Sequence, residues 1–458
     1  MKLLFFLCGL FLLGSCKSHF DLQITNATVF DTKSGTAVKN QNILIRADTI
    51  VALVSDNKSI KARKTIDAAG KLVTPGIIDA HIHPTHFFGD YDKAPLELAE
   101  DSLANYRQKF SDNYLPYGVT TVMIMGEPES WLKPILSWSA HPSPNFTDIY
   151  TVGGALISKE DRKPYICHIT VASPVAAREK VQSYFNMGIR HLKLYWLLRR
   201  PELEAAFKTA DSLGMKVYGH IDNGIMNMDT TLAIGLRNYE HIFTIMHSIA
   251  LSEEDDKKFV AGMEAVYGKG KLDSMSFIEA GMNEARFIVE NKSPALDSLI
   301  ERLANGGASF STTIHLFAEK FGLTYFSNPE NRPDSGLSSE RMRYSKENFK
   351  AFMTIVKKVY DKGIKIRIGT DVPNGGKAAL SEQLLLAEYG FSAPAIIQIS
   401  TINGAIALGL EAKYGSIESG KKADLIIYDK SPLVDYKEFR SSRTIIKEGQ
   451  VYETGVHY

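Results

Sequence analysis

The alternation of hydrophobic and polar positions divides this chain into two all-β ends and a middle of a different kind. Short alternating runs at 22–30, 42–45 and 49–54, and again at 423–428 and 443–447, predict strands separated by turns. A few strands at either end cannot bury a face alone. The two ends are therefore expected to pair into one small β-domain.

The middle of the chain alternates short apolar runs with helical patterns, such as the amphipathic stretch 201–213. Repeated β-α units over this length predict a parallel (β/α)8 barrel, with a doubly wound open sheet as the alternative. Long insertions at 242–307 and 315–363 either shape a pocket or decorate the surface. The eight predicted strands are a run ending at His83 and runs at 119–124, 148–152, 191–195, 216–220, 237–241, 308–312 and 365–371.

The first strand of the middle region ends in two histidines one residue apart, His81 and His83. Side chains at i and i+2 of a strand point to the same side, so the two imidazoles project together. Two imidazoles side by side can bind one divalent metal, although such a pair can also be an ordinary surface or core feature.

Ionisable residues also stand at the ends of later predicted strands: Lys193, His220, His241 and Asp371. Each has a structural explanation when taken singly, as a core histidine, a strand cap, a turn cap or an ion-pair partner. The carboxyl ends of barrel strands converge on one face, where catalytic sites are built. The whole set therefore favours a site at that face.

The N-terminus has the features of a processed segment. Lys2 precedes an apolar run at 3–13 and then Gly14-Ser15-Cys16, and the run is too short to span a bilayer. Residues 1–15 are predicted to be a signal peptide. The sequence Leu13-Gly14-Ser15-Cys16 resembles a bacterial lipobox, which implies lipidation of Cys16, a cell-envelope location and membrane contact only through the anchor. An ordinary secretory signal is the alternative.

Composition narrows the class of protein. The chain has 458 residues, 44% apolar and 23% charged, with a formal net charge of +1. This balance is typical of a globular enzyme and gives no basic excess for a nucleic-acid partner. Of the three cysteines only Cys167 lies clear of the signal segment and the lipobox, so no intramolecular disulfide is expected.

Several of these motifs together resemble the amidohydrolase superfamily, in its imidazolonepropionase-like and prolidase-like branch. The resemblance covers nearly the whole chain after the signal segment and is weakest in the insertion after His241. It implies a TIM barrel over 75–411 and a β-sandwich domain built from 20–74 and 412–458. The segments that carry it are Pro75-Gly76-Ile77-Ile78-Asp79-Ala80-His81-Ile82-His83, Gly219-His220, Tyr239-Glu240-His241, Ile368-Gly369-Thr370-Asp371 and Gly415 to Leu425.

The resemblance also implies a ligand set for two divalent metal ions. His81, His83 and Asp371 would bind the first, and His220 and His241 the second. Lys193 would bridge them as a carboxylated lysine, because an ammonium group has no lone pair to offer a cation. Zinc is favoured for such a set, with manganese, iron and cobalt as alternatives.

The activity implied is hydrolysis of an amide C–N bond in a dipeptide, an N-acyl amino acid or a cyclic amide. A metal-bridging hydroxide would attack the carbonyl, with Asp371 as general base and then general acid. Tyr195 and His315 are the candidate substrate contacts, and Arg199 with Arg200 could bind a peptide carboxylate. Alternatives are a heterocycle deaminase, a lactone or phosphotriester hydrolase, and a non-catalytic envelope binding lipoprotein.

Overall fold

The computed structural model describes residues 20–55, 60–88, 93–159, 167–222, 226–272, 275–323, 325–326, 339–373 and 375–452. The predicted signal segment 1–15 and Cys16 lie outside these residues. Among the helices of the described ranges, none combines the length and apolar character needed to cross a bilayer.

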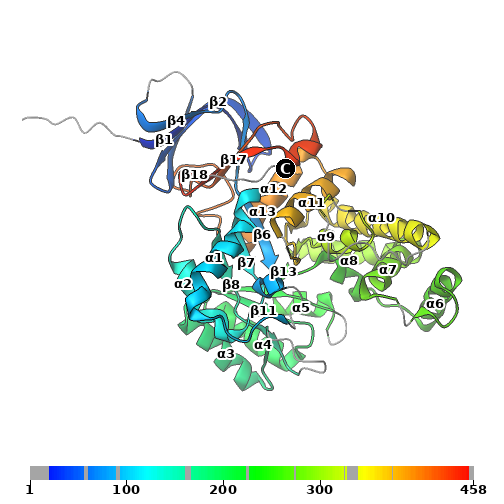
Figure 1. Ribbon diagram of the computed structural model, residues 1–458. Coiled ribbons are helices and arrows are strands. Elements are labelled where there is room, and N and C mark those ends of the chain that lie inside the picture. The colour runs from blue at the N-terminus through cyan, green and yellow to red at the C-terminus, as the bar shows by residue number, and fades with distance from the viewer. Residues whose placement is uncertain are drawn as a thin grey trace, which may run out of the picture.

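Strands from both ends of the chain lie in one eight-stranded sheet (Figure 1). β5 connects the two ends, because it pairs in parallel with β1 and antiparallel with β16. The sequence predicted a β-sandwich here, whereas the backbone hydrogen bonds define a single sheet. Its strands are β1 (Phe20–Asp31), β2 (Thr36–Arg46), β3 (Thr49–Ser55), β4 (Ala62–Asp67), β5 (Leu72–Pro75), β16 (Leu425–Tyr428), β17 (Arg443–Lys447) and β18 (Gln450–Tyr452).

The middle of the chain forms two parallel sheets of three and seven strands. Each of the eight predicted runs contains a strand, and β9 and β10 are additional. Backbone hydrogen bonds from Ala80 N to Ile368 O and from Asp371 N to His81 O, both 2.9 Å, join β6 to the segment after β15. The strands are β6 (Ile77–Ile82), β7 (Val119–Ile124), β8 (Asp148–Thr151), β9 (Ala155–Ile157), β10 (His168–Thr170), β11 (His191–Leu194), β12 (Lys216–Gly219), β13 (Asn238–Tyr239), β14 (Ser309–Ser311) and β15 (Lys365–Arg367).

The additional strand β9 follows the third predicted strand, β8, after a break at two glycines. β8 pairs with β7 and β9 pairs with β11, and Gly153 and Gly154 lie between β8 and β9. Gly153 has φ +73°, which disfavours any other residue, and a Cβ on Gly154 would come within 2.3 Å of Ile169. The break therefore follows from the backbone that these glycines allow.

Helices alternate with the parallel strands, so the α/β class is confirmed. The stretch predicted at 201–213 is α4, which begins with Pro201 in its first turn and buries Leu203, Ala206 and Ala210. The helices are α1 (Leu103–Asp112), α2 (Leu132–Ala140), α3 (Pro174–Asn186), α4 (Arg200–Ser212), α5 (Met228–Ile234), α6 (Glu253–Tyr267), α7 (Phe277–Asn291), α8 (Ser293–Asn305), α9 (Ile314–Lys320), α10 (Ser339–Asp361), α11 (Gly375–Glu388), α12 (Ala393–Ser400) and α13 (Ile402–Leu408).

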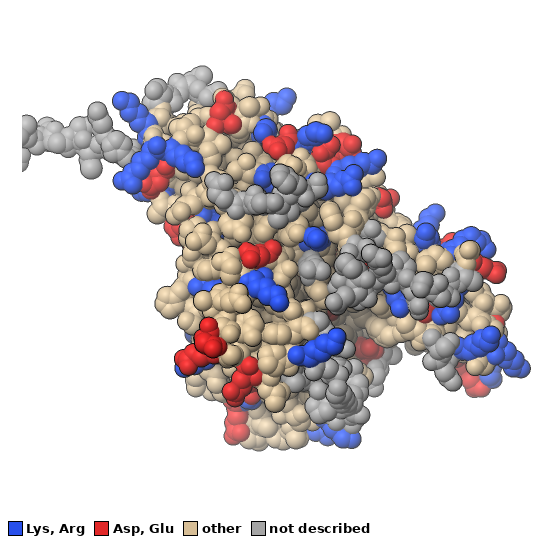
Figure 2. Space-filling model, viewed as in Figure 1, with Lys and Arg blue, Asp and Glu red and all other residues tan. Residues whose placement is uncertain are grey.

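The insertion at 242–307 contains the 3-10 helix Ile242–Ser248 and helices α6, α7 and α8. In Figure 1, α6 lies at the tip of the helical side of the molecule, far from the terminal sheet. The acidic start predicted for α6 is a capping box, in which Ser252 and Asp255 bond to each other's backbone. Charged side chains of both signs are interspersed over the visible surface, as Figure 2 shows.

A buried ion cluster joins the terminal sheet to the parallel strands. Lys447 of β17 is fully buried, and its Nζ lies 2.9 Å from Asp148 at the start of β8 and 3.1 Å from Asp424 before β16. The Tyr414 hydroxyl donates to the same Asp148 oxygen at 2.9 Å. Two buried carboxylates therefore depend on one ammonium group for their compensation.

Replacing Lys447 with Met should destabilise the protein by ~3–5 kcal/mol, because Asp148 and Asp424 would stay buried without their cation. The free energy of unfolding in urea measures the change. Lys33→Met is the matched control: its exposed pair with Glu418 should be worth less than about 1 kcal/mol. Equal, small effects of the two substitutions would contradict this account of the interface.

Candidate metal centre

His81 of β6 and His83, the residue just after its end, direct their side chains to the same place, as their period-two spacing predicted. The Nε2 atoms of His81 and His83 lie 3.3 Å apart. His81 is fully buried, and the side chain of His83 is 11% exposed. These two nitrogens and a carboxylate oxygen of Asp371 all lie within 4.8 Å of one another.

The other ring nitrogen of each histidine fixes which nitrogen carries the proton. His81 Nδ1 lies 2.6 Å from Glu240 Oε2, and His83 Nδ1 lies 2.9 Å from the carbonyl oxygen of Gly126. Both partners are acceptors, so both Nδ1 atoms donate. Burial, the largest cause, and nearby positive charge hold the pKa of both imidazoles well below the usual range. Two neutral rings therefore direct unprotonated Nε2 lone pairs at each other, an arrangement that a bound cation would stabilise.

Asp371 is the third member of this group. Its Oδ1 lies 3.4 Å from His83 Nε2 and 3.8 Å from His81 Nε2. The carboxylate of Asp79 holds its position by accepting from Thr370 N at 3.0 Å and Thr370 Oγ1 at 2.7 Å. Burial raises the pKa of Asp371 to about 7 against the opposing effect of Lys193.

His241 and His220 adjoin the group on its other side. The ring centroid of His241 lies 4.4 Å from that of His81 and 4.7 Å from that of His220. The Nδ1 of His220 is a buried polar atom with no hydrogen-bond partner, and burial lowers the pKa of this histidine to about 3. A neutral imidazole with an unused nitrogen is suited to ligate a metal.

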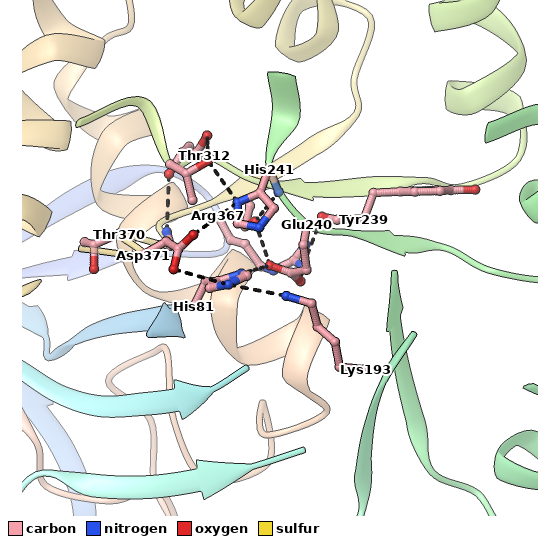
Figure 3. Close-up of polar contacts among 12 residues, drawn as sticks. His81, Lys193, Tyr239, Glu240, His241, Thr312, Arg367, Thr370 and Asp371 are labelled. Carbon is pink, nitrogen blue, oxygen red and sulfur yellow. Dashed lines mark hydrogen bonds and ion pairs between the residues drawn. The ribbon is translucent and has the colours of Figure 1, made fainter. Parts of the chain in front are cut away.

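Lys193 of β11 enters the same space, as Figure 3 shows, with its Nζ 3.4 Å from His81 Nε2. The side chain is buried, and burial lowers its pKa to about 8, although Glu240 and Asp371 oppose the shift. Part of the Lys193 population is therefore the neutral amine near neutral pH. Only that form is nucleophilic.

Glu240 is a site residue that the ligand pattern alone does not reveal. It accepts from His81 Nδ1, from Ser311 Oγ at 2.7 Å and from the buried guanidinium of Arg367 at 2.5 Å. Strand alternation would place its side chain opposite that of His241. β13 ends at Tyr239, however, and His241 has φ +62°, so both side chains turn inward.

The predicted substrate contacts have different surroundings. Tyr195 adjoins the centre, with its ring 4.8 Å from that of His220 and 4.5 Å from that of His168 on β10. His315 is buried in the first turn of α9, and its backbone amide donates to Glu382. Arg199 and Arg200 pair with Glu202 and Glu204 within α4, so these acids already compensate the cations proposed for a peptide carboxylate.

Glu127 has a buried carboxyl group and directly follows Gly126, whose carbonyl orients His83. Thr151 Oγ1 donates to Glu127 Oε1, whereas Oε2 has no hydrogen-bond partner. Burial raises the pKa of Glu127 to about 8, against the lowering effect of Thr151. This side chain is therefore largely protonated at neutral pH.

Comparison with known proteins agrees with this geometry. The amidohydrolase family matches residues 72–451. An imidazolonepropionase of Thermoplasma acidophilum is 32% identical over 109 residues, which are 22% of this chain and 26% of that protein. The crystal structure of Aspergillus niger ochratoxinase superposes with a TM-score of 0.66 at 16% identity, covering 95% of this chain and 96% of that one.

A Xaa-Pro dipeptidase, solved with methionine bound in its active site, superposes with a TM-score of 0.62 at 21% identity. The superposition covers 94% of this chain and 100% of the dipeptidase chain. Because the family match extends over most of the sequence, this chain belongs to the amidohydrolase family. The aligned part spans about a quarter of the imidazolonepropionase. The likeness to the two solved structures shows the fold.

Glu127→Gln should stabilise the protein in alkaline solution. The folded-state pKa of about 8 lies above the ordinary glutamate value of 4.5, so the folded state binds the extra proton and stability falls as pH rises between these values. The amide removes this loss, which is ~4–5 kcal/mol at pH 9 from about 1.4 kcal/mol per pKa unit. Urea unfolding at pH 5 and pH 9 measures the difference.

The exposed acid Glu253 provides the control, since Glu253→Gln should change stability little at either pH. A Glu127→Gln gain of the same size at both pH values would show that Glu127 is ionised throughout.

Proposed function

We propose that this protein is a metal-dependent hydrolase of an amide C–N bond in a small molecule or short peptide. The observation that carries the proposal is the convergence of two unprotonated imidazole nitrogens and the Asp371 carboxylate. His220, His241 and Lys193 border the same space. The named hydrolases among the relatives and the family membership support the reaction class.

The ligand set fits two divalent ions, with zinc favoured by the imidazole and carboxylate donors. His81, His83 and Asp371 would hold one, and His220 and His241 the other. Lys193 would bridge them after its neutral amine adds to carbon dioxide, which forms a carbamate and releases a proton. The lowered pKa of Lys193 supports this reaction because it leaves amine available near neutral pH.

Bound ions would lower the pKa of water towards neutrality and polarise the substrate carbonyl. Asp371 would accept the proton of the attacking water and then deliver it to the leaving nitrogen. Its place within 4 Å of His81 and His83 suits this role. Glu240 and the Gly126 carbonyl keep the proton of each imidazole on Nδ1. Tyr195, beside His220, would contact the substrate.

The substrate would be a dipeptide, an N-acyl amino acid or a cyclic amide. A deaminase is the second enzyme candidate, since Asp222 lies two residues after His220. Asp222 is paired with His247 at 3.0 Å, and Lys193 faces His81 at a position that a one-metal deaminase would not need. Both observations favour the two-metal amide hydrolase.

The architecture and location complete the proposal. The hydrogen bonds between β6 and the segment after β15 support a closed (β/α)8 barrel over 75–411. The shared sheet supports one β-domain built from 20–74 and 412–458. The lipobox resemblance supports an envelope protein anchored through lipid on Cys16, with the substrate as its small-molecule partner.

Asp371→Asn should reduce kcat by about 10³-fold or more while leaving the thermal midpoint within a few degrees, because an amide cannot take up the proton. Steady-state hydrolysis over a panel of dipeptides, N-acyl amino acids and cyclic amides, together with calorimetry, measures both. Turnover near that of the wild type would remove Asp371 from this role.

Metal analysis provides an independent test. Protein purified with carbonate and zinc present should hold about two ions per chain, and chelation should abolish amide hydrolysis until metal is restored. Lys193→Ala should lower the content towards one ion, and exposed Lys208→Ala should leave it unchanged. One ion in the wild type would favour the deaminase, and none would favour the binding protein.

A further inference from the structure

An exposed aromatic residue stands at the start of insertion helix α7. Phe277 is the first residue of the helix, and its side chain is 60% exposed to solvent. A capping box between Ser276 and Glu279 fixes the helix start. A single exposed phenylalanine is ordinary on a protein surface, so the significance of Phe277 depends on what its ring contacts.

Aromatic contacts connect Phe277 to the metal centre. Its ring lies 5.7 Å from that of Phe243, which is buried. The Phe243 ring in turn lies 5.8 Å from His241 and 6.3 Å from His220. The Phe243 ring therefore connects two of the proposed ligands to the exposed Phe277 by direct aromatic contacts.

A cluster of three ionisable residues holds α7 against the barrel. His247, which precedes α6, lies with Nδ1 3.0 Å from Asp222 and with Nε2 3.4 Å from Glu284 of α7. Asp222 follows β12, so the cluster joins that strand end, the first turns of the insertion and α7. The two carboxylates outweigh the opposing effect of burial and raise the pKa of His247 to about 10.

We propose that Phe277 is a specificity-determining residue, which packs against a bulky apolar group next to the scissile amide of the substrate. Phe243 is the inner wall of this subsite, and the Asp222–His247–Glu284 cluster is a positioning device for α7. The inference rests on the proposed amide hydrolysis and adds its substrate class: amides with an aromatic or large aliphatic side chain.

The test compares two dipeptide series, X-Gly and Gly-X, in which X is Phe, Leu, Ala or Gly. In one of the series, wild-type kcat/KM should favour Phe over Gly by roughly tenfold or more, the size expected for a filled apolar subsite. Phe277→Ala should reduce that preference to below about threefold with little change for the glycine substrate. Val260→Ala, an exposed apolar residue of α6, is the matched control and should retain the preference.

Glu284→Gln tests the positioning role. We expect it to raise KM for the Phe substrate several-fold while kcat and the glycine substrate change little. Glu290→Gln, on the same helix and paired with Arg286, should have no effect. An unchanged preference in Phe277→Ala, or a wild type that does not distinguish Phe from Gly, overturns the inference even if amides are hydrolysed.

Binding provides a readout that does not depend on turnover. Calorimetric titration of Phe-Gly, Gly-Phe and Gly-Gly into Asp371→Asn protein, with and without Phe277→Ala, measures occupation of the subsite directly. Tighter binding of one Phe peptide that is lost with Phe277→Ala supports the inference even if no amide is hydrolysed, in which case only the proposed function fails. Equal binding of all three peptides overturns the inference.

Discussion

The candidate metal centre depends on one constraint, which is the close approach of two imidazole lone pairs. His81 and His83 could relieve it if either ring turned or moved its proton to Nε2. Neither change is available, because Glu240 and the Gly126 carbonyl require a proton on Nδ1 of each ring. The surroundings thus keep two basic nitrogens facing each other at 3.3 Å. Such an arrangement costs stability in the absence of a bound metal cation. Binding of a cation would restore that stability.

The surrounding fold contributes further strain to the same point. His241, Thr313 and Asp371 all have positive φ, between +51° and +62°. This conformation is unfavourable for β-branched threonine in particular. Buried ion pairs and hydrogen bonds around Glu240, Arg367 and Asp79 hold the segments in place. Strained backbone and closely spaced basic nitrogens therefore occur together where the chemistry is proposed, as expected for a preorganised site.

The sequence predicted which ionisable side chains converge better than it predicted the groups that orient them. His81 and His83 follow from the period of two along a strand, and Lys193, His220, His241 and Asp371 from their places at strand ends. Glu240 could not be assigned in this way, because its direction depends on the left-handed backbone of His241 after β13 has ended. The Gly126 carbonyl is a backbone acceptor, and its role cannot be read from the residue type. Both are tertiary features.

The same reasoning explains which fold elements escaped prediction. β9 and β10 are each three residues long, and Gly153 and Gly154 interrupt the run that would otherwise have continued. Lys447 gave no sequence signal either, since a lysine at the end of a short strand ordinarily faces solvent. Its burial depends on Asp148 and Asp424, which are distant in sequence.

These two buried charge systems lie at opposite ends of the parallel strands. Asp148, the partner of Lys447, is the first residue of β8, whereas the proposed ligands stand at or beyond the C-terminal ends of β6, β11, β12, β13 and β15. The attachment of the terminal sheet and the proposed metal centre thus use opposite ends of the parallel strands, the division expected if these strands form the proposed (β/α)8 barrel. Loops at the ligand face, including the 242–307 insertion, can vary in sequence without disturbing the interface that holds the two parts together.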